Sequence, residues 1–244
     1  MDMDGTRAKI RLFVDQPLGA GQPVALSQPQ AHYLGNVLRK GPGTDVALFN
    51  NRDGEWRAEL SELGKRGGVA LCRAQSAPQR MPPDLWLIFA PIKKARTDFI
   101  VEKAAELGAA RILPVQTAFT NSERIRQDRL QAHAIEAAEQ CGGTYVPEVA
   151  ALQPLGRLLD HWPSGRALIF ADESLADTAR ATPLPPAPAA LLIGPEGGFS
   201  DAERARLRAM VEIHPIALGP RVLRADTAAV AALTLWQNAQ GDWR

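Results

Sequence analysis

Short stretches in which apolar and polar residues alternate fill the first third of the chain. Turn residues separate five of them, and the alternation predicts β-strands at residues 11–14, 23–26, 45–49, 55–62 and 69–74. One helix is predicted after the second strand, because Ser27 and Gln30 have the spacing of a capping box and an apolar helical face follows. The pattern predicts a small β-barrel with one helix over residues 1–75.

Beyond residues 76–83, a proline-containing segment that is typical of a linker, the pattern changes. Apolar runs that predict strands occur at 85–90, 111–115, 167–170, 190–193 and 213–217. Helical patterns lie between them at 97–107, 124–141 and 155–160. This alternation predicts an α/β domain with a mainly parallel sheet over residues 84–244.

The strand predicted at 190–193 leads into the sequence GPEGGFS at 194–200. Gly197 and Gly198 allow main-chain amides to approach a ligand without an intervening Cβ. Ser200 and Glu203 have capping-box spacing, which predicts a helix that starts just after Gly198 with its positive end toward the loop. A tight strand-to-helix turn would use the same residues.

A second loop, LGPRVLRADTA at 218–228, follows the last predicted strand. It holds two arginines and a Gly-Pro pair, and Asp226 and Thr227 stand where a helix N-cap is expected. A simple turn does not require this many functional side chains. Both loops leave the carboxyl ends of strands, where open α/β sheets bind their ligands.

The charge is nearly balanced, at +1 for 244 residues of which 45% are hydrophobic. Residues 1–80 carry 11 basic against 8 acidic side chains, while the remainder carries 17 against 19. The N-terminal part is therefore the better candidate for binding phosphates.

Cysteine and histidine placement argues against a metal centre or a disulfide framework. Cys72 and Cys141 are far apart, which fits a reducing cytoplasm. The four histidines are equally scattered: His32, His133, His161 and His214. The first residues lack the apolar run of a signal peptide, and the longest apolar run, 85–92, is too short to span a bilayer. We therefore expect a soluble, cytoplasmic protein without a bound metal.

Residues 193–199 and 218–224 resemble the two signature segments of the RsmE-type methyltransferases, which belong to the SPOUT (α/β-knot) class. The resemblance continues in order through segments at 11–14, 32–39, 103–108, 112–114, 138–140 and 146–148. It implies a C-terminal trefoil-knot domain preceded by a PUA-like RNA-binding β-barrel. Two positions depart from the family pattern: Ala225-Asp226 replaces the more usual Thr-Glu, and Gly143 replaces a common arginine.

The resemblance implies methylation of N3 of a uridine in 16S ribosomal RNA of the small subunit, with S-adenosylmethionine as cofactor and a homodimer as the working form. The positions that match the family's cofactor site are Leu192, Gly194, Glu196, Gly197, Gly198, Leu218, Gly219, Leu223, Arg224 and Thr227. Three alternatives stay open: action on another RNA, RNA binding without catalysis, and an unrelated phosphate-handling enzyme. Neither a dinucleotide-binding GxGxxG motif nor a Walker A loop is present.

Methylation at N3 of uracil requires removal of the imide proton. Arg224 or Arg221 could stabilise the resulting anion, and Asp226 or Glu196 could accept the proton. Asp226 could instead serve only as a helix N-cap.

Candidate RNA contacts in the N-terminal domain are Arg11, His32, Arg39, Lys40 and Arg52. Each of them could equally be an ordinary solvated surface residue. On the last helix, an apolar stripe of Val230, Leu233 and Trp236 could form the dimer contact or belong to the core.

Overall fold

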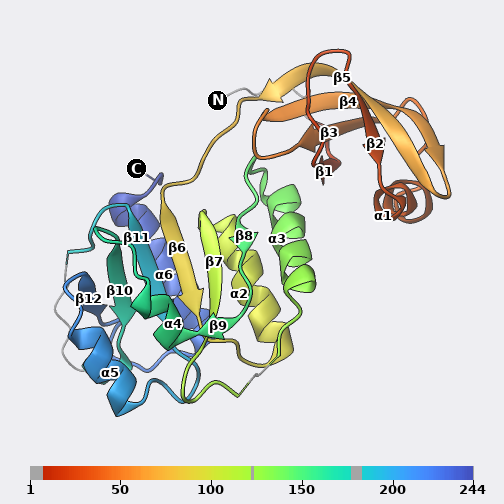
Figure 1. Ribbon diagram of the computed structural model, residues 1–244. Helices are drawn as coiled ribbons and strands as arrows, with labels where there is room; N and C mark the ends of the chain where they lie inside the picture. The colour runs from red at the N-terminus through yellow and green to blue at the C-terminus, as the bar shows by residue number, and fades with distance from the viewer. Residues whose placement is uncertain (1–7, 122–123, 177–182, 244) are drawn as a thin grey trace. The chain divides into compact units, whose positions relative to one another are not determined.

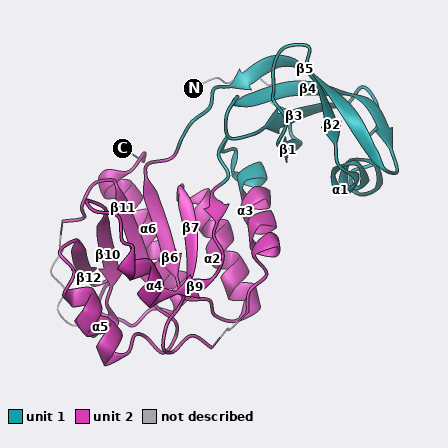
Figure 2. Cartoon of the chain, in the orientation of Figure 1, with its two compact units in different colours: residues 1–81, 138–146 teal, residues 82–137, 147–244 magenta. Residues whose placement is uncertain are grey.

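The computed structural model describes residues 8–121, 124–176 and 183–243, and the chain forms two compact units (Figures 1 and 2). Unit 1 consists of residues 1–81 and 138–146, and unit 2 consists of residues 82–137 and 147–244. The segment 138–146 thus belongs to unit 1, although the residues on both sides of it in the sequence belong to unit 2. The domain limits predicted from the sequence contain no such exchange.

Unit 1 is built on a mixed five-stranded sheet in the order β1-β3-β4-β5-β2. Its strands are β1 (Arg11–Phe13), β2 (Pro23–Leu26), β3 (Asp45–Phe49), β4 (Glu55–Gly64) and β5 (Gly67–Ala77). The β1–β3 pair is parallel and the other pairs are antiparallel. All five predicted strands are present. The central hairpin is longer than predicted at both ends: its pairing continues through glycines next to the turn, which strand propensity disfavours, and β5 extends to Ala77 at the other end.

The predicted helix of unit 1 is confirmed as α1 (Gln28–His32), and its capping box is formed. The Gln30 side-chain oxygen accepts a hydrogen bond from the Ser27 amide at 2.9 Å, and the Ser27 hydroxyl accepts one from the Gln30 amide at 3.4 Å. The helix continues as a π-helix, η1 (Tyr33–Val37). Arg39 follows with a φ of 54°, so the helical segment ends on a left-handed residue.

Unit 2 contains a seven-stranded sheet in the order β12-β10-β11-β6-β7-β8, with β9 also paired to β7. Its strands are β6 (Leu85–Phe89), β7 (Arg111–Gln116), β8 (Glu148–Val149), β9 (Gln153–Pro154), β10 (Ala167–Ala171), β11 (Ala189–Ile193) and β12 (Ile213–Ile216). Every pair is parallel, which confirms the prediction of a mainly parallel sheet. The trefoil knot stays a prediction, because strand order alone does not define it.

Helices cover both faces of this sheet (Figure 1). They are α2 (Lys94–Glu106), α3 (Gln127–Cys141), α4 (Leu155–Asp160), α5 (Asp201–Arg208) and α6 (Ala225–Gln240), with a short 3-10 helix, η2 (Glu173–Leu175). Apolar residues of α4 and α5 pack on one face. Helices α2 and α6 pack together on the other (Figure 1). Leu233 and Trp236 of the apolar stripe are fully buried, so the core alternative holds for both of them.

The strand order gathers three loops at the carboxyl edge of the sheet. After β11 the chain passes β10 before it forms β12, so β10 lies between the two. Phe170 pairs with Leu192 of β11, and Ala171 pairs with Ile216 of β12. The connections that follow these three strands therefore start side by side.

Candidate functional site

The loops after β10, β11 and β12 surround a cavity, here called the first cavity. Its lining residues are Ala171, Asp172, Glu173, Ala176, Ile193, Gly194, Pro195, Glu196, Gly197, Gly198, Leu218, Gly219, Arg221, Val222, Leu223, Ala225 and Ala228. Both loops that the sequence singled out contribute. The wall formed by the β10–η2 connection was not predicted.

Two glycines in the β11–α5 loop are required by close packing. A Cβ on Gly194 would stand 2.5 Å from the Phe199 ring. Gly198 has a φ of +69°, and a Cβ there would stand 2.1 Å from Oε1 of Glu173. Glycine at these two positions leaves room for Phe199 and Glu173 beside the loop.

The start of α5 confirms the predicted capping box. The Ser200 hydroxyl accepts a hydrogen bond from the Glu203 amide at 3.3 Å, and Glu203 Oε2 accepts one from the Ser200 amide at 2.9 Å. The helix begins at Asp201, directly after the cap. The two reciprocal bonds fix the direction in which the glycine loop enters α5.

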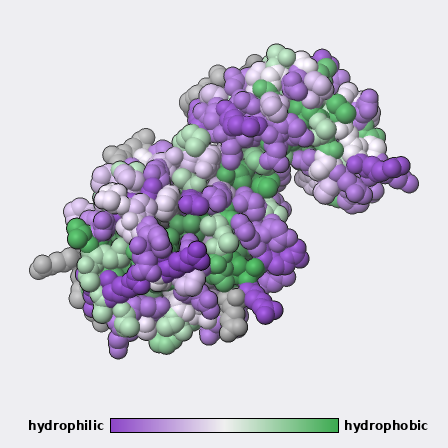
Figure 3. Space-filling model, in the orientation of Figure 1, coloured by the Kyte–Doolittle hydropathy of each residue, from purple (hydrophilic) through white to green (hydrophobic). Residues whose placement is uncertain are grey.

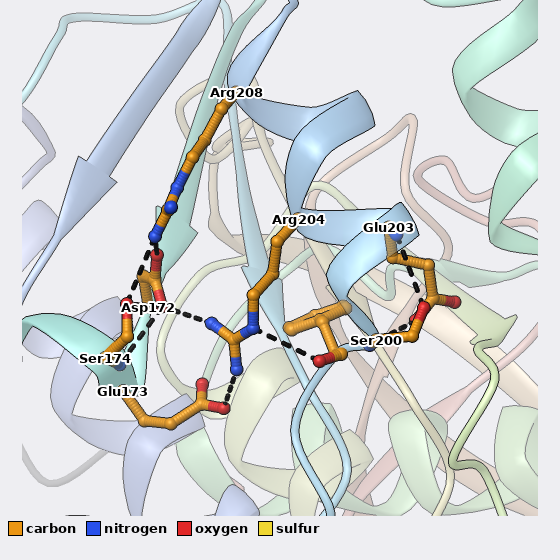
Figure 4. Close-up of polar contacts among 8 residues, drawn as sticks. Asp172, Glu173, Ser174, Ser200, Glu203, Arg204 and Arg208 are labelled. Atoms are coloured by element: carbon orange, nitrogen blue, oxygen red, sulfur yellow. Dashed lines mark hydrogen bonds and ion pairs between the residues drawn. The ribbon is translucent and has the colours of Figure 1, made fainter.

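Arg204 of α5 connects the glycine loop to the unpredicted wall (Figure 4). Its guanidinium donates to Asp172 and Glu173, and its Nε donates to the Phe199 carbonyl at 3.1 Å. The Asp172 side chain is fully buried, and that of Arg204 is 16% exposed. One side chain thus links two of the three loops that surround the first cavity.

Asp172 is a buried carboxylate with several donors around it (Figure 4). Arg208 Nη2 donates to its Oδ2 at 2.7 Å, and the Ser174 hydroxyl donates to its Oδ1 at 2.7 Å. Burial by itself would raise the pKa of Asp172, but the hydrogen bonds from Arg208 and Ser174 and the charge of Arg204 outweigh it. The pKa is held below its ordinary value, so Asp172 is ionised at neutral pH and forms ion pairs with Arg204 and Arg208.

The start of α6 corrects one prediction. Arg224, not Asp226 or Thr227, is the N-cap, and it makes no side-chain capping bond. Asp226 lies in the first turn, where its Oδ1 accepts a hydrogen bond from the Thr227 amide at 2.9 Å. Ala225, the first residue of the helix, is buried. A carboxylate in the first turn still interacts favourably with the helix dipole.

Arg96 of α2 joins two candidate catalytic carboxylates. Its Nη1 donates to Glu196 Oε1 at 2.9 Å, and its Nε lies 3.6 Å from Asp226 Oδ2. Sequence reasoning missed Arg96. The available signal was its place among basic residues just after β6, at the same carboxyl edge of the sheet.

The structure brings most of the predicted cofactor residues together. Seven of the ten line the first cavity: Gly194, Glu196, Gly197, Gly198, Leu218, Gly219 and Leu223. Leu192 lies in the core on β11, and Arg224 and Thr227 are exposed and are not among the lining residues.

Of the four candidate catalytic residues, two line the first cavity and two do not. Glu196 and Arg221 line the first cavity and are exposed. Asp226 is partly buried and is held close to Glu196 through Arg96. Arg224 is exposed at the cap of α6.

Arg11 has a structural role that replaces the expected RNA contact. Its side chain is 8% exposed, and its Nε pairs with the fully buried Glu55 at 2.6 Å. Its remaining nitrogens donate to the carbonyls of Ala138, Glu139 and Gly143 at 2.5–2.8 Å. Arg11 therefore binds the segment 138–146 to the sheet of unit 1. The family often has arginine at position 143; here the backbone carbonyl of Gly143 accepts one of the Arg11 hydrogen bonds.

The other RNA candidates lie on the surface of unit 1. His32, Arg39 and Lys40 are exposed on or just after the α1–η1 segment. Arg52 is also exposed, and its Nη2 donates to the Asp15 carbonyl at 2.7 Å.

Among the described residues, no group of three or more His, Cys, Asp or Glu side chains is placed to hold a metal ion. Cys72 and Cys141 are free thiols. No helix within the described ranges has the length and apolar character needed to cross a membrane. Much of the face seen in Figure 3 is hydrophilic.

A parallel α/β sheet with a glycine-lined cavity at its carboxyl edge places the protein in the class of α/β proteins that bind their ligands at that edge. Comparison with known families agrees with this class. The chain belongs to the RNA methyltransferase family: residues 79–237 match its RNA methyltransferase domain, and residues 26–70 match its PUA domain.

Two curated relatives are named ribosomal RNA small subunit methyltransferase E. The one from Synechocystis is 32% identical over 86% of this chain and 71% of its own length. The one from Rickettsia conorii is 26% identical over 91% of this chain and 93% of its own length. The similarity therefore includes both units.

Two solved structures are similar along nearly the whole chain. Ribosomal RNA small subunit methyltransferase E from Neisseria gonorrhoeae, bound to S-adenosyl methionine, has a TM-score of 0.84 at 28% identity and covers 96% of this chain and 99% of its own. A putative methyltransferase from Legionella pneumophila, in complex with the same cofactor, has a TM-score of 0.82 at 31% identity and covers 97% and 100%.

Proposed function

We propose that this protein transfers a methyl group from S-adenosylmethionine to N3 of a uridine in 16S ribosomal RNA of the small subunit. One observation carries the proposal. The two segments that resemble the RsmE-type signatures meet in the first cavity, in a chain whose fold matches those of two relatives that hold this cofactor.

The first cavity fits the cofactor chemically. Gly194, Gly197 and Gly198 line it without side chains, so their main-chain groups are accessible to a ligand. Backbone groups near Gly194 and Leu218 can hydrogen-bond the edge of an adenine, and the side chain of Leu223 can cover its face. When bound, S-adenosylmethionine supplies a methyl group on a positively charged sulfur.

The protein must also remove the proton from N3 of uracil. We assign this step to Asp226 or Glu196, because Glu196 lines the first cavity and Asp226, next to the lining residue Ala225, shares Arg96 with it. Arg96 positions them through ion pairs. Arg221 or Arg224 would stabilise the uracil anion through its oxygens. The negative charge of the carboxylates is thus paired with Arg96 of α2, and that of the uracil anion with an arginine of the loop after β12.

Calorimetry and single-turnover kinetics test the assignment. Wild-type protein is expected to bind S-adenosylmethionine, and Asp226→Asn is expected to bind it equally well while it methylates at least 100-fold more slowly, the low end of general-base contributions. Asp201→Asn, on the exposed first turn of α5, is the matched control and keeps the wild-type rate. Wild-type rates for Asp226→Asn across pH would exclude it as the base and leave Glu196.

Unit 1 is proposed to bind the ribosomal RNA through His32, Arg39, Lys40 and Arg52. Its charge supports this role, because Arg39 and Lys40 are adjacent exposed cations just after the α1–η1 segment. Reversal of Arg39 and Lys40 to glutamate is expected to weaken RNA binding and to flatten its dependence on salt. An unchanged slope would remove both residues from the RNA-binding surface.

We further propose that the protein works as a homodimer in the cytoplasm, where its ribosomal substrate is found. The partly exposed side of α6 that carries Leu235 is available for such a contact, since Leu233 and Trp236 are in the core. Sedimentation equilibrium at micromolar concentration is expected to show a dimer. A monomer alone would contradict the proposal.

A further inference from the structure

A second cavity lies at the same carboxyl edge of the unit 2 sheet, where β6 leads into α2 and β7 leads toward α3. Four cationic side chains and one carboxylate, that of Asp98, contribute to its lining. The cations are Lys94, Arg124, Arg126 and Arg129. The proposed methyl transfer uses none of these residues.

The positive charge of this cavity is only partly neutralised. Arg129 pairs with the buried Asp98, and Arg126 pairs with Asp128 at 2.6 Å on the surface. Lys94 and Arg124 are exposed, and neither has an ion-pair partner within the described ranges. Two uncompensated cations on two neighbouring connections are suited to a ligand that carries more than one negative charge.

Phe119 lies on the same β7–α3 connection, and its side chain is 48% exposed. Two hydrogen bonds hold the turn that carries it: the Thr117 amide donates to the Thr120 hydroxyl at 2.9 Å, and the Ala118 amide donates to Glu203 Oε1 at 2.8 Å.

The Phe119 side chain also touches the glycine loop of the first cavity. A Cβ on Gly197 would stand 3.1 Å from Cβ of Phe119. An exposed aromatic ring is thus held in place beside the first cavity, on the connection that also supplies Arg124 to the second.

We infer that Lys94, Phe119 and Arg124, together the flanking-strand site, bind the single-stranded RNA next to the nucleotide that enters the first cavity. Lys94 and Arg124 contact its phosphates, and one base stacks on Phe119. Cations interleaved with an exposed aromatic residue are the combination that single-stranded nucleic acids bind. The inference rests on the proposed function, because it assumes that RNA reaches the first cavity.

Binding of a fluorescent 12-nucleotide, uridine-rich single-stranded RNA tests the flanking-strand site. The double variant Lys94→Ala/Arg124→Ala is expected to flatten the slope of log K against log salt by about 1.4, since each phosphate contact to a single strand contributes about 0.7. The matched control is Arg157→Ala, on the exposed surface of α4 in the same unit, and it is expected to keep the wild-type slope.

The aromatic residue needs a variant that keeps its packing against Gly197. Phe119→Leu preserves an apolar side chain and is expected to weaken RNA binding about 5- to 150-fold, the range for loss of one stacked base. Phe119→Tyr is expected to restore binding. Affinity for S-adenosylmethionine, measured by calorimetry, should stay at the wild-type level in both, which shows that the first cavity is intact.

Methylation of small subunits by the wild-type protein is measured alongside. Wild-type affinity and salt slope in both the double variant and Phe119→Leu would overturn the inference, even where wild-type protein methylates the subunits. Absent methylation by wild-type protein would instead count against the proposed function, while the binding series would still decide whether the flanking-strand site holds RNA.

Discussion

Replacement of Asp172 with asparagine measures how far the wall of the first cavity depends on one buried charge. The substitution keeps the shape of the side chain but removes its charge, which Arg204 and Arg208 both contact. Arg208 is 51% exposed and can turn to water, so its share of the loss is below about 1 kcal/mol. Arg204 is 16% exposed, and a hydrogen bond to a charged group of that kind contributes about 1.5–3 kcal/mol. The expected total loss of unfolding free energy is about 2–3 kcal/mol.

Urea unfolding at pH 7, with Arg208→Ala as the control at under about 1 kcal/mol, measures this difference. Its pH dependence has a definite sign. The pKa of Asp172 is lower in the folded protein than its ordinary value of 3.8, so its contribution is present in full above that value and is lost as the pH falls through the folded pKa. The difference between wild type and Asp172→Asn should be constant from about pH 7 to 5 and shrink below about pH 4. A difference under about 0.5 kcal/mol at pH 7, or one that grows in acid, would refute the reasoning.

Two further predictions concern other parts of the chain. Gly198→Ala should weaken calorimetric binding of S-adenosylmethionine at least about 5-fold, because a residue other than glycine costs about 1–2 kcal/mol at the positive φ of this position and its Cβ would displace the Glu173 carboxylate; wild-type affinity would contradict the requirement for glycine here. Arg11→Ala should lower the unfolding free energy by about 3–5 kcal/mol, since it removes the guanidinium from the buried Glu55 carboxylate. Exposed Arg39→Ala should change it by less than about 0.5 kcal/mol, and equal effects of the two variants in urea unfolding would contradict the structural role of Arg11.

Local signals in the sequence were sufficient for most of the elements and for two loops of the site, but not for the short elements β8, β9 and η2. The capping boxes at Ser27 and Ser200 depend on residues three positions apart, and both are formed in the structure. The longer strands of unit 2 could be predicted from apolar runs, because helices cover both faces of its sheet (Figure 1) and bury these side chains. Because parallel strands end at a common edge, the loops after β11 and β12 could be expected to meet there.

Contacts between distant residues had no comparable signal. Arg96 reaches Glu196 across 100 positions, and Arg11 reaches Glu139 across 128. Arginine is usually found at the surface, and only the fold shows that the Arg11 side chain is 8% exposed. The wall at Asp172 was missed for the same reason, because its two arginine partners lie more than 30 positions away on α5.

Transfer of a labelled methyl group to ribosomal RNA tests the central claim most directly. Small ribosomal subunits from cells that lack the protein are incubated with purified protein and labelled S-adenosylmethionine, and the nucleosides of the 16S RNA are analysed by mass spectrometry. Labelled 3-methyluridine is the expected product. A sample without labelled 3-methyluridine, from protein that binds the cofactor in calorimetry, would contradict the proposed reaction on this RNA.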